Sequence, residues 1–141
     1  MTEHSHGFTK DVLAVDDHPV NLRLIMRQIQ SLNYSVDAVA SGEQALALLA
    51  KGRYQLILTD CHMSGMDGFE LARQLRMLEK APAPQTPIFL CTADETLDEA
   101  AVRGVAINGV MLKPIDRPRL LELLRRWCIR PSSPPSEGEA P

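Results

Sequence analysis

Five short apolar runs alternate with segments of helical periodicity, and no other feature of the sequence constrains the fold as much. Alternating strands and helices are typical of βα units joined by right-handed crossovers. Continuous apolarity within the runs indicates strands buried on both faces of a parallel sheet. We therefore predict an α/β fold with a five-stranded parallel sheet covered by helices on both faces. The predicted strands are residues 12–15, 35–40, 56–59, 88–92 and 110–112, and the weakest run, 35–40, is expected nearer an edge.

Apolar residues at helical spacing predict five helices between and after these strands. Pro19 suits the first turn of a helix, and Ser41 has the side chain of a helix N-cap. Gly52 is expected to stop the helix that Ser41 begins. The predicted helices are residues 19–32, 43–51, 69–78, 97–105 and 117–128.

A chain of 141 residues is long enough for one domain and too short for two ordinary ones. We predict a flexible leader at residues 1–9, one domain at 10–129 and a Pro- and Ser-rich linker or tail at 130–141. Three cysteines, Cys61, Cys91 and Cys128, without a CxxC spacing exclude a disulfide framework. We expect Cys91 and Cys128 to fill the core.

Composition excludes several classes of function. With a net charge of −3, the chain lacks the excess of basic residues that is typical of a nucleic-acid binder, so no nucleic-acid partner is expected. No apolar run approaches the roughly 20 residues of a membrane span, and the first ten residues have no apolar signal region. We therefore expect no membrane contact by this segment and a cytoplasmic location, including the cytoplasmic part of an inner-membrane sensor kinase.

Polar residues stand where the predicted strands end, the edge at which parallel sheets carry their binding sites. Asp16 and Asp17 follow the first strand, and Asp60 follows the third. If these strands are neighbours, three carboxylates converge in one crevice. Two unit charges about 4 Å apart repel by roughly 4 kcal/mol at an effective dielectric constant of about 20. Either one carboxylate takes up a proton or a cation holds all three, and an all-oxygen acidic site suits Mg²⁺ rather than zinc.

Two further residues complete a chemical set. Thr92 closes the fourth strand with a hydroxyl, and Lys113 follows the fifth with a positive charge. Each residue alone is commonplace, since Asp favours turns and Thr favours strands. Together, a carboxylate nucleophile, a divalent cation, a lysine and a hydroxyl describe a site that accepts a phosphoryl group.

Four segments carry a resemblance to a known family: VDDHPVNLRLI, ILTDCHMSGMDGFEL, FLCTAD and VMLKPID. They closely resemble the receiver domain of two-component response regulators, over roughly residues 10 to 128. The resemblance implies a doubly wound, flavodoxin-like receiver fold with strand order 2-1-3-4-5. That order places the first and third strands side by side, as the carboxylate argument requires.

The resemblance also implies roles for the acidic residues. Asp60 matches the phospho-accepting aspartate. The metal ligands for Mg²⁺ would be Asp60, the acidic pair Asp16 and Asp17, and the backbone carbonyl of His62. In the family the second residue of the pair usually binds the ion directly, and the first often acts through water.

The residues around the phosphoryl group are implied in the same way. Lys113 matches the lysine that pairs with that group, and the peptide bond to Pro114 is often cis in the family. Thr92 matches the switch hydroxyl, and small Ala93 leaves the phosphoryl group room. Gly68 matches a turn glycine that opens the third helix.

Some positions depart from the common pattern or vary within it. Ser64 stands where DxxMP usually has proline, and we expect it to loosen the loop after Asp60. Val110 stands where many receivers carry Tyr or Phe, which puts coupling of Thr92 to a swinging aromatic ring in doubt. His62 and Asp94 occupy variable positions that are expected to tune phosphoryl lifetime, although His62 could instead be a solvated side chain that offers only its carbonyl.

We interpret the chain as a phosphorelay receiver that takes a phosphoryl group from the phosphohistidine of a histidine kinase onto Asp60 and switches conformation. The DDHPVNL and TDCHM motifs and the tail most resemble the receiver of a hybrid sensor histidine kinase, which would pass the group to a histidine-phosphotransfer domain. Leu22 and Met26 on the first helix either dock such a helical partner or belong to the core. This segment would catalyse its own phosphorylation and dephosphorylation without independent multiple turnover.

Three alternatives remain open. One is a freestanding single-domain response regulator. Another is an Asp-nucleophile phosphatase, which typically shows DxDx[TV], whereas Cys61 and His62 follow Asp60 here. The third is a binding-only pseudo-receiver, which the complete set of chemical residues disfavours.

Overall fold

A computed structural model describes residues 8–79, 85–94 and 107–128. Five parallel strands form one sheet in the order β2-β1-β3-β4-β5, which confirms the predicted fold class and strand order. β1 lies between β2 and β3, and its register pairs Val15 with Thr59 of β3. The strands are β1 (Lys10–Val15), β2 (Val36–Val39), β3 (Tyr54–Asp60), β4 (Ile88–Thr92) and β5 (Gly109–Leu112).

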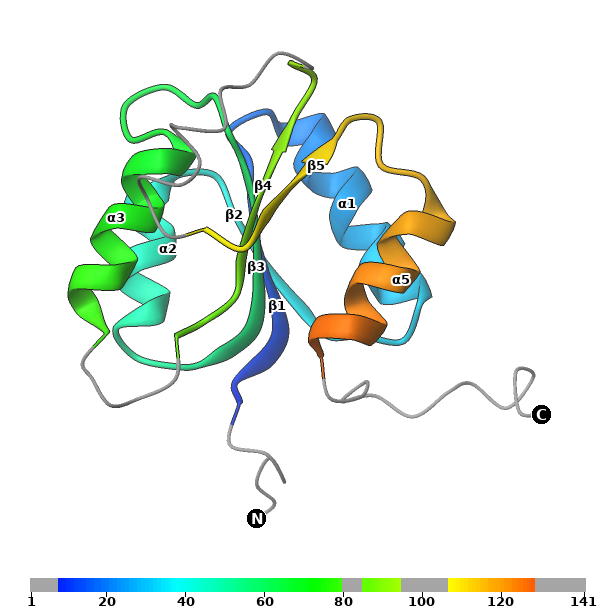
Figure 1. Cartoon of the computed structure of the whole chain (residues 1–141), viewed down its shortest axis with the longest axis horizontal. Helices are drawn as coiled ribbons and strands as arrows, with labels where there is room; N and C mark the ends of the chain where they lie inside the picture. The colour runs from blue at the N-terminus through cyan, green and yellow to red at the C-terminus, as the bar shows by residue number, and fades with distance from the viewer. Residues whose placement is uncertain (1–7, 80–84, 95–106, 129–141) are drawn as a thin grey trace.

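The described residues contain four helices, two on each face of the sheet. Figure 1 shows α2 and α3 together on one side and α1 and α5 on the other. They are α1 (Pro19–Ser31), α2 (Gly42–Leu49), α3 (Gly68–Leu78) and α5 (Arg117–Trp127). The helix predicted at residues 97–105 lies outside the described residues.

Polar side chains cap the helices at their N-termini, where backbone N–H groups lack partners within the helix. Ser41 accepts a hydrogen bond from the N–H of Gln44 at 3.1 Å, which confirms it as the cap of α2. Asp67 and Asp116 cap α3 and α5 in the same way, with bonds of 2.8 and 2.9 Å. α2 ends at Leu49, before the predicted limit of residue 51, and the N–H of Gly52 bonds back to the carbonyl of Leu48.

The core has two layers, one on each face of the sheet. Val12 and Ala14 of β1 pack toward α1 and α5, whereas Leu13 and Val15 pack toward α2 and α3. Successive residues of a strand point to opposite faces, so a strand covered on both sides must be apolar throughout. Each fully buried Leu or Ile contributes roughly 1.5–3 kcal/mol. The edge strands β2 and β5 are mostly half-buried, which explains the weak apolar pattern of the second run.

Cys61, Cys91 and Cys128 are free and buried, so the expectation for Cys91 and Cys128 is confirmed. Leu22 and Met26 are half-buried against the core on the α1 and α5 side, which favours the core alternative for both. In none of the described helices does an apolar stretch reach the length that crossing a bilayer requires.

Candidate functional site

Three carboxylates meet at the carboxyl edge of the sheet. Asp16 and Asp17 follow β1, and Asp60 is the last residue of the neighbouring strand β3. One carboxylate oxygen from each residue lies within 4.8 Å of one from each of the others. The predicted convergence of the three acidic side chains is therefore present in the structure.

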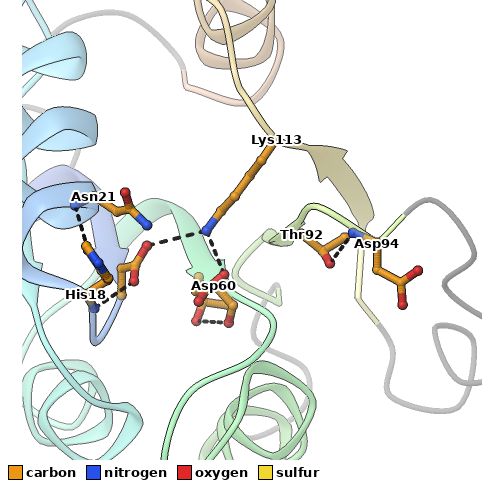
Figure 2. A network of polar contacts seen from close by, with 8 residues as sticks. His18, Asn21, Asp60, Thr92, Asp94 and Lys113 are labelled. Carbon is orange, nitrogen blue, oxygen red and sulfur yellow. Dashed lines mark hydrogen bonds and ion pairs between the residues drawn. The ribbon is translucent and has the colours of Figure 1, made fainter.

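Lys113 joins two of these carboxylates from the loop after β5. Its Nζ lies 2.8 Å from Oδ1 of Asp60 and 3.6 Å from Oδ2 of Asp16, and Figure 2 shows the side chain reaching down to Asp60. Burial alone would lower the pKa of the Lys113 ammonium, but the hydrogen bond to Asp60 and the charges of Asp60 and Asp16 outweigh burial and raise this pKa. Lys113 therefore carries a positive charge in the crevice at neutral pH. The peptide bond from Lys113 to Pro114 is cis, the isomer that is often present in the family.

The two residues of the acidic pair differ in their surroundings. Asp16 is buried, and burial raises its pKa. The N–H of His18, at 2.9 Å, lowers that pKa, and the charge of Asp60 raises it further. Asp17 is exposed, and its Oδ2 accepts both the N–H and the hydroxyl of Ser64, at 2.9 and 3.1 Å. The Ser64 N–H is the main reason that the pKa of Asp17 is lowered.

The donor set fits a hard divalent cation. Three carboxylates at the surface end of a sheet supply only oxygen ligands, which Mg²⁺ prefers, and leave room for water. A bound cation would also offset the charge of Asp60, which adds to burial in raising the pKa of Asp16. His62 lies two residues after Asp60 with an exposed side chain, and its assignment as a carbonyl ligand stays a prediction.

Thr92, at the end of β4, is buried, and its hydroxyl accepts the N–H of Asp94 at 3.0 Å. Figure 2 draws this pair on the other side of Asp60 from His18 and Asn21. Asp94 and Ala93 are exposed, and Val110 in β5 is half-buried. The roles proposed for Thr92, Ala93 and Asp94 stay predictions, since they concern a phosphorylated state.

Gly68 allows α3 to begin directly against the end of β3. A Cβ at Gly68 would lie 2.6 Å from the carbonyl oxygen of Asp60 and 3.2 Å from the Cα of Cys61. The N–H of Gly68 also donates to the carbonyl of Cys61 at 3.0 Å. The start of α3 lies so close to the backbone of Asp60 that position 68 has no space for a side chain.

A cavity of about 540 Å³ opens beside the carboxylates, between α1 and the loop after β5. Asp16, Asp60 and Lys113 line it together with apolar side chains that include Leu24 and Ile115. Leu24 and Val20 are 56% and 60% exposed on α1. On this helix, the sequence indicated Leu22 and Met26, rather than Val20 and Leu24, as candidates for docking a partner. Helical spacing could have separated the two pairs, because Leu22 and Met26 share a face with buried Ile29, whereas Val20 and Leu24 do not.

Ser64 makes two contacts that the expectation of a looser loop did not include. We expected a serine in place of proline to loosen the loop after Asp60. The structure instead ties this loop to Asp17 through the two bonds from Ser64. Proline could make neither bond, because it has no backbone N–H and no hydroxyl.

Known proteins resemble this chain over most of its length. The family model described as the response regulator receiver domain matches residues 12–125. Among curated proteins, the virulence sensor protein BvgS of Bordetella pertussis is 38% identical over 138 residues, covering 92% of this chain and 11% of that protein. The sensor protein EvgS of Escherichia coli K12 is 38% identical over 106 residues, covering 74% of this chain and 8% of that protein. The chain thus spans about a tenth of the length of these relatives.

Two solved structures are also similar to this chain in fold and in sequence. The receiver domain of sensor histidine kinase PA1611 from Pseudomonas aeruginosa, with a magnesium ion coordinated in its active site cleft, has a TM-score of 0.74 and 33% identity. That comparison covers 84% of this chain and 96% of the other. The chemotaxis protein CheY4 of Vibrio cholerae has a TM-score of 0.75 and 31% identity, covering 84% of this chain and 98% of that one.

Proposed function

The chain belongs to the response regulator receiver domain family, and from that premise we propose that Asp60 accepts a phosphoryl group from a phosphohistidine. One observation carries the proposal. The Asp60 carboxylate stands at the end of β3, bonded to Lys113 at 2.8 Å, among three carboxylates beside an open cavity. This arrangement holds a nucleophile, a cationic partner for phosphoryl oxygens and ligands for a divalent cation in one place.

In the proposed reaction, a carboxylate oxygen of Asp60 attacks the phosphorus in line. The new phosphorus–oxygen bond forms as the phosphorus–nitrogen bond of the phosphohistidine breaks, and the imidazole keeps the electron pair. Lys113 then pairs with a phosphoryl oxygen instead of the carboxylate. The protein contributes positioning and electrostatic stabilisation, which supply most of the catalysis in phosphoryl transfer.

Asp16, Asp17, Asp60 and the backbone carbonyl of His62 are the proposed ligands of Mg²⁺. When bound, the ion supplies positive charge that balances the crowded carboxylates and the phosphoryl oxygens. The oxygen donors that cluster within 4.8 Å support this assignment. So does the similarity to a receiver that was solved with magnesium in its cleft.

Phosphorylation would shift an equilibrium between two conformations. We propose that the Thr92 hydroxyl leaves the N–H of Asp94 and donates to a phosphoryl oxygen, drawing the segment after β4 toward Asp60. Ala93 beside it has a side chain small enough to leave space. Val110 has no ring to rotate, so the change would pass through the backbone after β4.

The proposed partners are a histidine kinase that donates the phosphoryl group and a histidine-phosphotransfer domain that receives it. The curated relatives that support this context are sensor proteins, of which this chain matches about a tenth. We propose that the chain is the receiver segment of a cytoplasmic hybrid kinase region and that partners dock on α1, where Val20 and Leu24 are exposed. A freestanding regulator is the alternative, and the length of the parent gene separates the two.

Intact mass after incubation with acetyl phosphate and Mg²⁺ tests the proposal. We expect one phosphoryl adduct on the wild-type protein and none on Asp60→Asn, which keeps the size of the side chain. Hydrolysis of many equivalents of a phosphate ester would favour the phosphatase alternative. The absence of any adduct on the wild-type protein would favour the pseudo-receiver and contradict the proposal.

A further inference from the structure

Ser64 and Asp17 connect the two loops that flank the acidic cluster. Asp17 lies between β1 and α1, Ser64 lies between β3 and α3, and 47 positions separate them in the sequence. Oδ2 of Asp17 accepts the backbone N–H of Ser64 at 2.9 Å and its hydroxyl at 3.1 Å. A single residue thus supplies two donors to a single carboxylate oxygen.

Lys113 contacts two of the three carboxylates in the cluster, and Ser64 donates to the third. Lys113 contacts Asp60 and Asp16, at 2.8 and 3.6 Å. Asp17 is exposed, and the donors that the structure gives it from another segment come from Ser64. An exposed carboxylate can rotate freely between rotamers, and two like charges within 4.8 Å favour rotation toward solvent. The bonds from Ser64 oppose that rotation.

We propose that Ser64 is a positioning residue for the divalent cation: its two donors hold the Asp17 carboxylate in the orientation in which it binds the ion. Both donors use Oδ2 and neither uses Oδ1, so the ion can bind through Oδ1 while both bonds remain. Hydrogen-bond partners of ligating carboxylates typically change metal affinity by about 10- to 100-fold. The inference rests on the proposed magnesium site and deepens it, because it explains what a serine does where the family pattern usually has proline.

Calorimetric titration of the whole chain with Mg²⁺ at constant ionic strength tests the role of Ser64. Ser64→Ala removes the hydroxyl and keeps the N–H, so we expect the Kd to rise by about threefold. Ser64→Pro removes both donors, and we expect a rise of about tenfold or more. Ser64→Thr keeps both donors and should stay within about twofold of the wild type.

Ser31→Ala is the matched control, because the Ser31 hydroxyl is also exposed and hydrogen-bonded but lies at the end of α1. Its Kd should equal that of the wild type. Melting temperatures measured in EDTA establish that each variant is folded, and Ser64→Ala keeps the test valid should Ser64→Pro misfold. Unchanged or tighter binding by Ser64→Ala and Ser64→Pro overturns the inference, as does failure of Ser64→Thr to restore affinity.

The intact-mass assay separates this inference from the proposed function. If the wild-type protein gains its phosphoryl adduct while the Ser64 variants bind Mg²⁺ with wild-type affinity, only the role of Ser64 is wrong. If the wild-type protein binds no Mg²⁺ and gains no adduct, the proposed function fails and the inference fails with it.

Discussion

At the scale of single residues, the charge balance of the crevice depends on Lys113. Its ammonium lies 2.8 Å from Asp60 and 3.6 Å from Asp16, so it neutralises part of a cluster that would otherwise hold three negative charges. The positive charge of Lys113 repels a cation bound in the site. The same charge would stabilise the negative oxygens of a transferred phosphoryl group. Removing it should therefore change metal binding and phosphoryl transfer in opposite directions.

Lys113→Ala should bind Mg²⁺ more tightly, because one positive charge is gone from the site. Phosphoryl transfer from acetyl phosphate should slow by about 100-fold, the cost of losing one donor to the developing charge. Magnesium titration and a mass time course measure the two effects, with exposed Lys51→Ala as the control. Weaker magnesium binding together with an unchanged rate would show that Lys113 has neither role.

Residue identities alone predicted much of this site. The sequence placed four polar residues directly after predicted strands, and the topology of the sheet brings their side chains to one edge: Asp16, Asp17, Asp60 and Lys113. The bond between Ser64 and Asp17 could not be predicted, because it depends on the relative positions of two loops, which no local pattern encodes. The opposite expectation, a looser loop, considered only the conformational stiffness that proline would have given.

At the scale of secondary-structure elements, α3 must begin close to the end of β3 for the site to form. Gly68→Ala would place a Cβ 2.6 Å from the carbonyl oxygen of Asp60, so α3 or the end of β3 must move. We expect a loss of about 1–3 kcal/mol in the free energy of unfolding, the usual cost of overpacking, and slower phosphorylation. Urea denaturation measures the free energy of unfolding, and the mass time course measures the rate of phosphorylation.

Gly42→Ala is the matched control, since Gly42 is the first residue of α2 as Gly68 is of α3. Its Cβ would meet the Sδ, Cγ and Cβ of Met66 at 2.7, 3.0 and 3.2 Å, which all belong to one side chain, whereas the nearest atom at Gly68 is a backbone oxygen. Gly42→Ala should therefore lower the free energy of unfolding by less than Gly68→Ala does, and it should leave phosphorylation unchanged. Equal effects of the two substitutions would mean that the contact with Asp60 is unimportant.

Tyr54 and Asp37 connect β3 to β2 across β1. The Tyr54 hydroxyl donates to Asp37 at 2.6 Å. Burial, and then the bond and charge of Asp37, raise the pKa of Tyr54 above its ordinary value of 10.0. The folded state therefore keeps the phenol proton at a pH where the unfolded chain has lost it. This contribution to stability is complete below pH 10 and is lost as the pH rises above it.

We expect the unfolding free energy of the wild type to fall more steeply above about pH 10 than that of Tyr54→Phe, which has no phenol to ionise. Below about pH 9 the wild type should be the more stable of the two. Urea denaturation at several pH values measures the difference. Parallel pH profiles for the two proteins would contradict the assignment.

The elements themselves were largely predictable. β4 matches its predicted range, because a central strand buried on both faces must be apolar throughout. β3 extends beyond its predicted range at both ends, because strand pairing continues into polar positions that apolar periodicity does not mark. α1 and α2 instead end one and two residues before their predicted limits. On α1, Leu22 and Met26 pack against the core, the second of the two alternatives, and the exposed pair is Val20 and Leu24, which helical spacing places on another face.

At the scale of the whole molecule, a cavity opens beside the site, between α1 and the loop after β5. Leu24 borders this opening and is 56% exposed. Met77 is 77% exposed on α3, against the other face of the sheet (Figure 1). A large phosphodonor must approach through the opening, whereas acetyl phosphate needs no docking surface.

Leu24→Glu should slow transfer from a phosphorylated histidine-phosphotransfer domain by about tenfold or more, because a charge would replace apolar contact area at the interface. Its labelling by acetyl phosphate should stay at the wild-type rate. Met77→Glu, the control on the opposite side, should change neither reaction. Slowing of both reactions by Leu24→Glu would mean that the substitution damages the site rather than docking.

The identity of the phosphorylated residue tests the account most directly. Borohydride reduces an aspartyl phosphate to homoserine, which peptide mass spectrometry assigns to a position. After acetyl phosphate and Mg²⁺, we predict homoserine at position 60 and only unmodified aspartate at positions 16 and 17, with the product lost when EDTA removes the metal. Homoserine at position 16 or 17, or a yield at position 60 that does not depend on Mg²⁺, would contradict the proposed site.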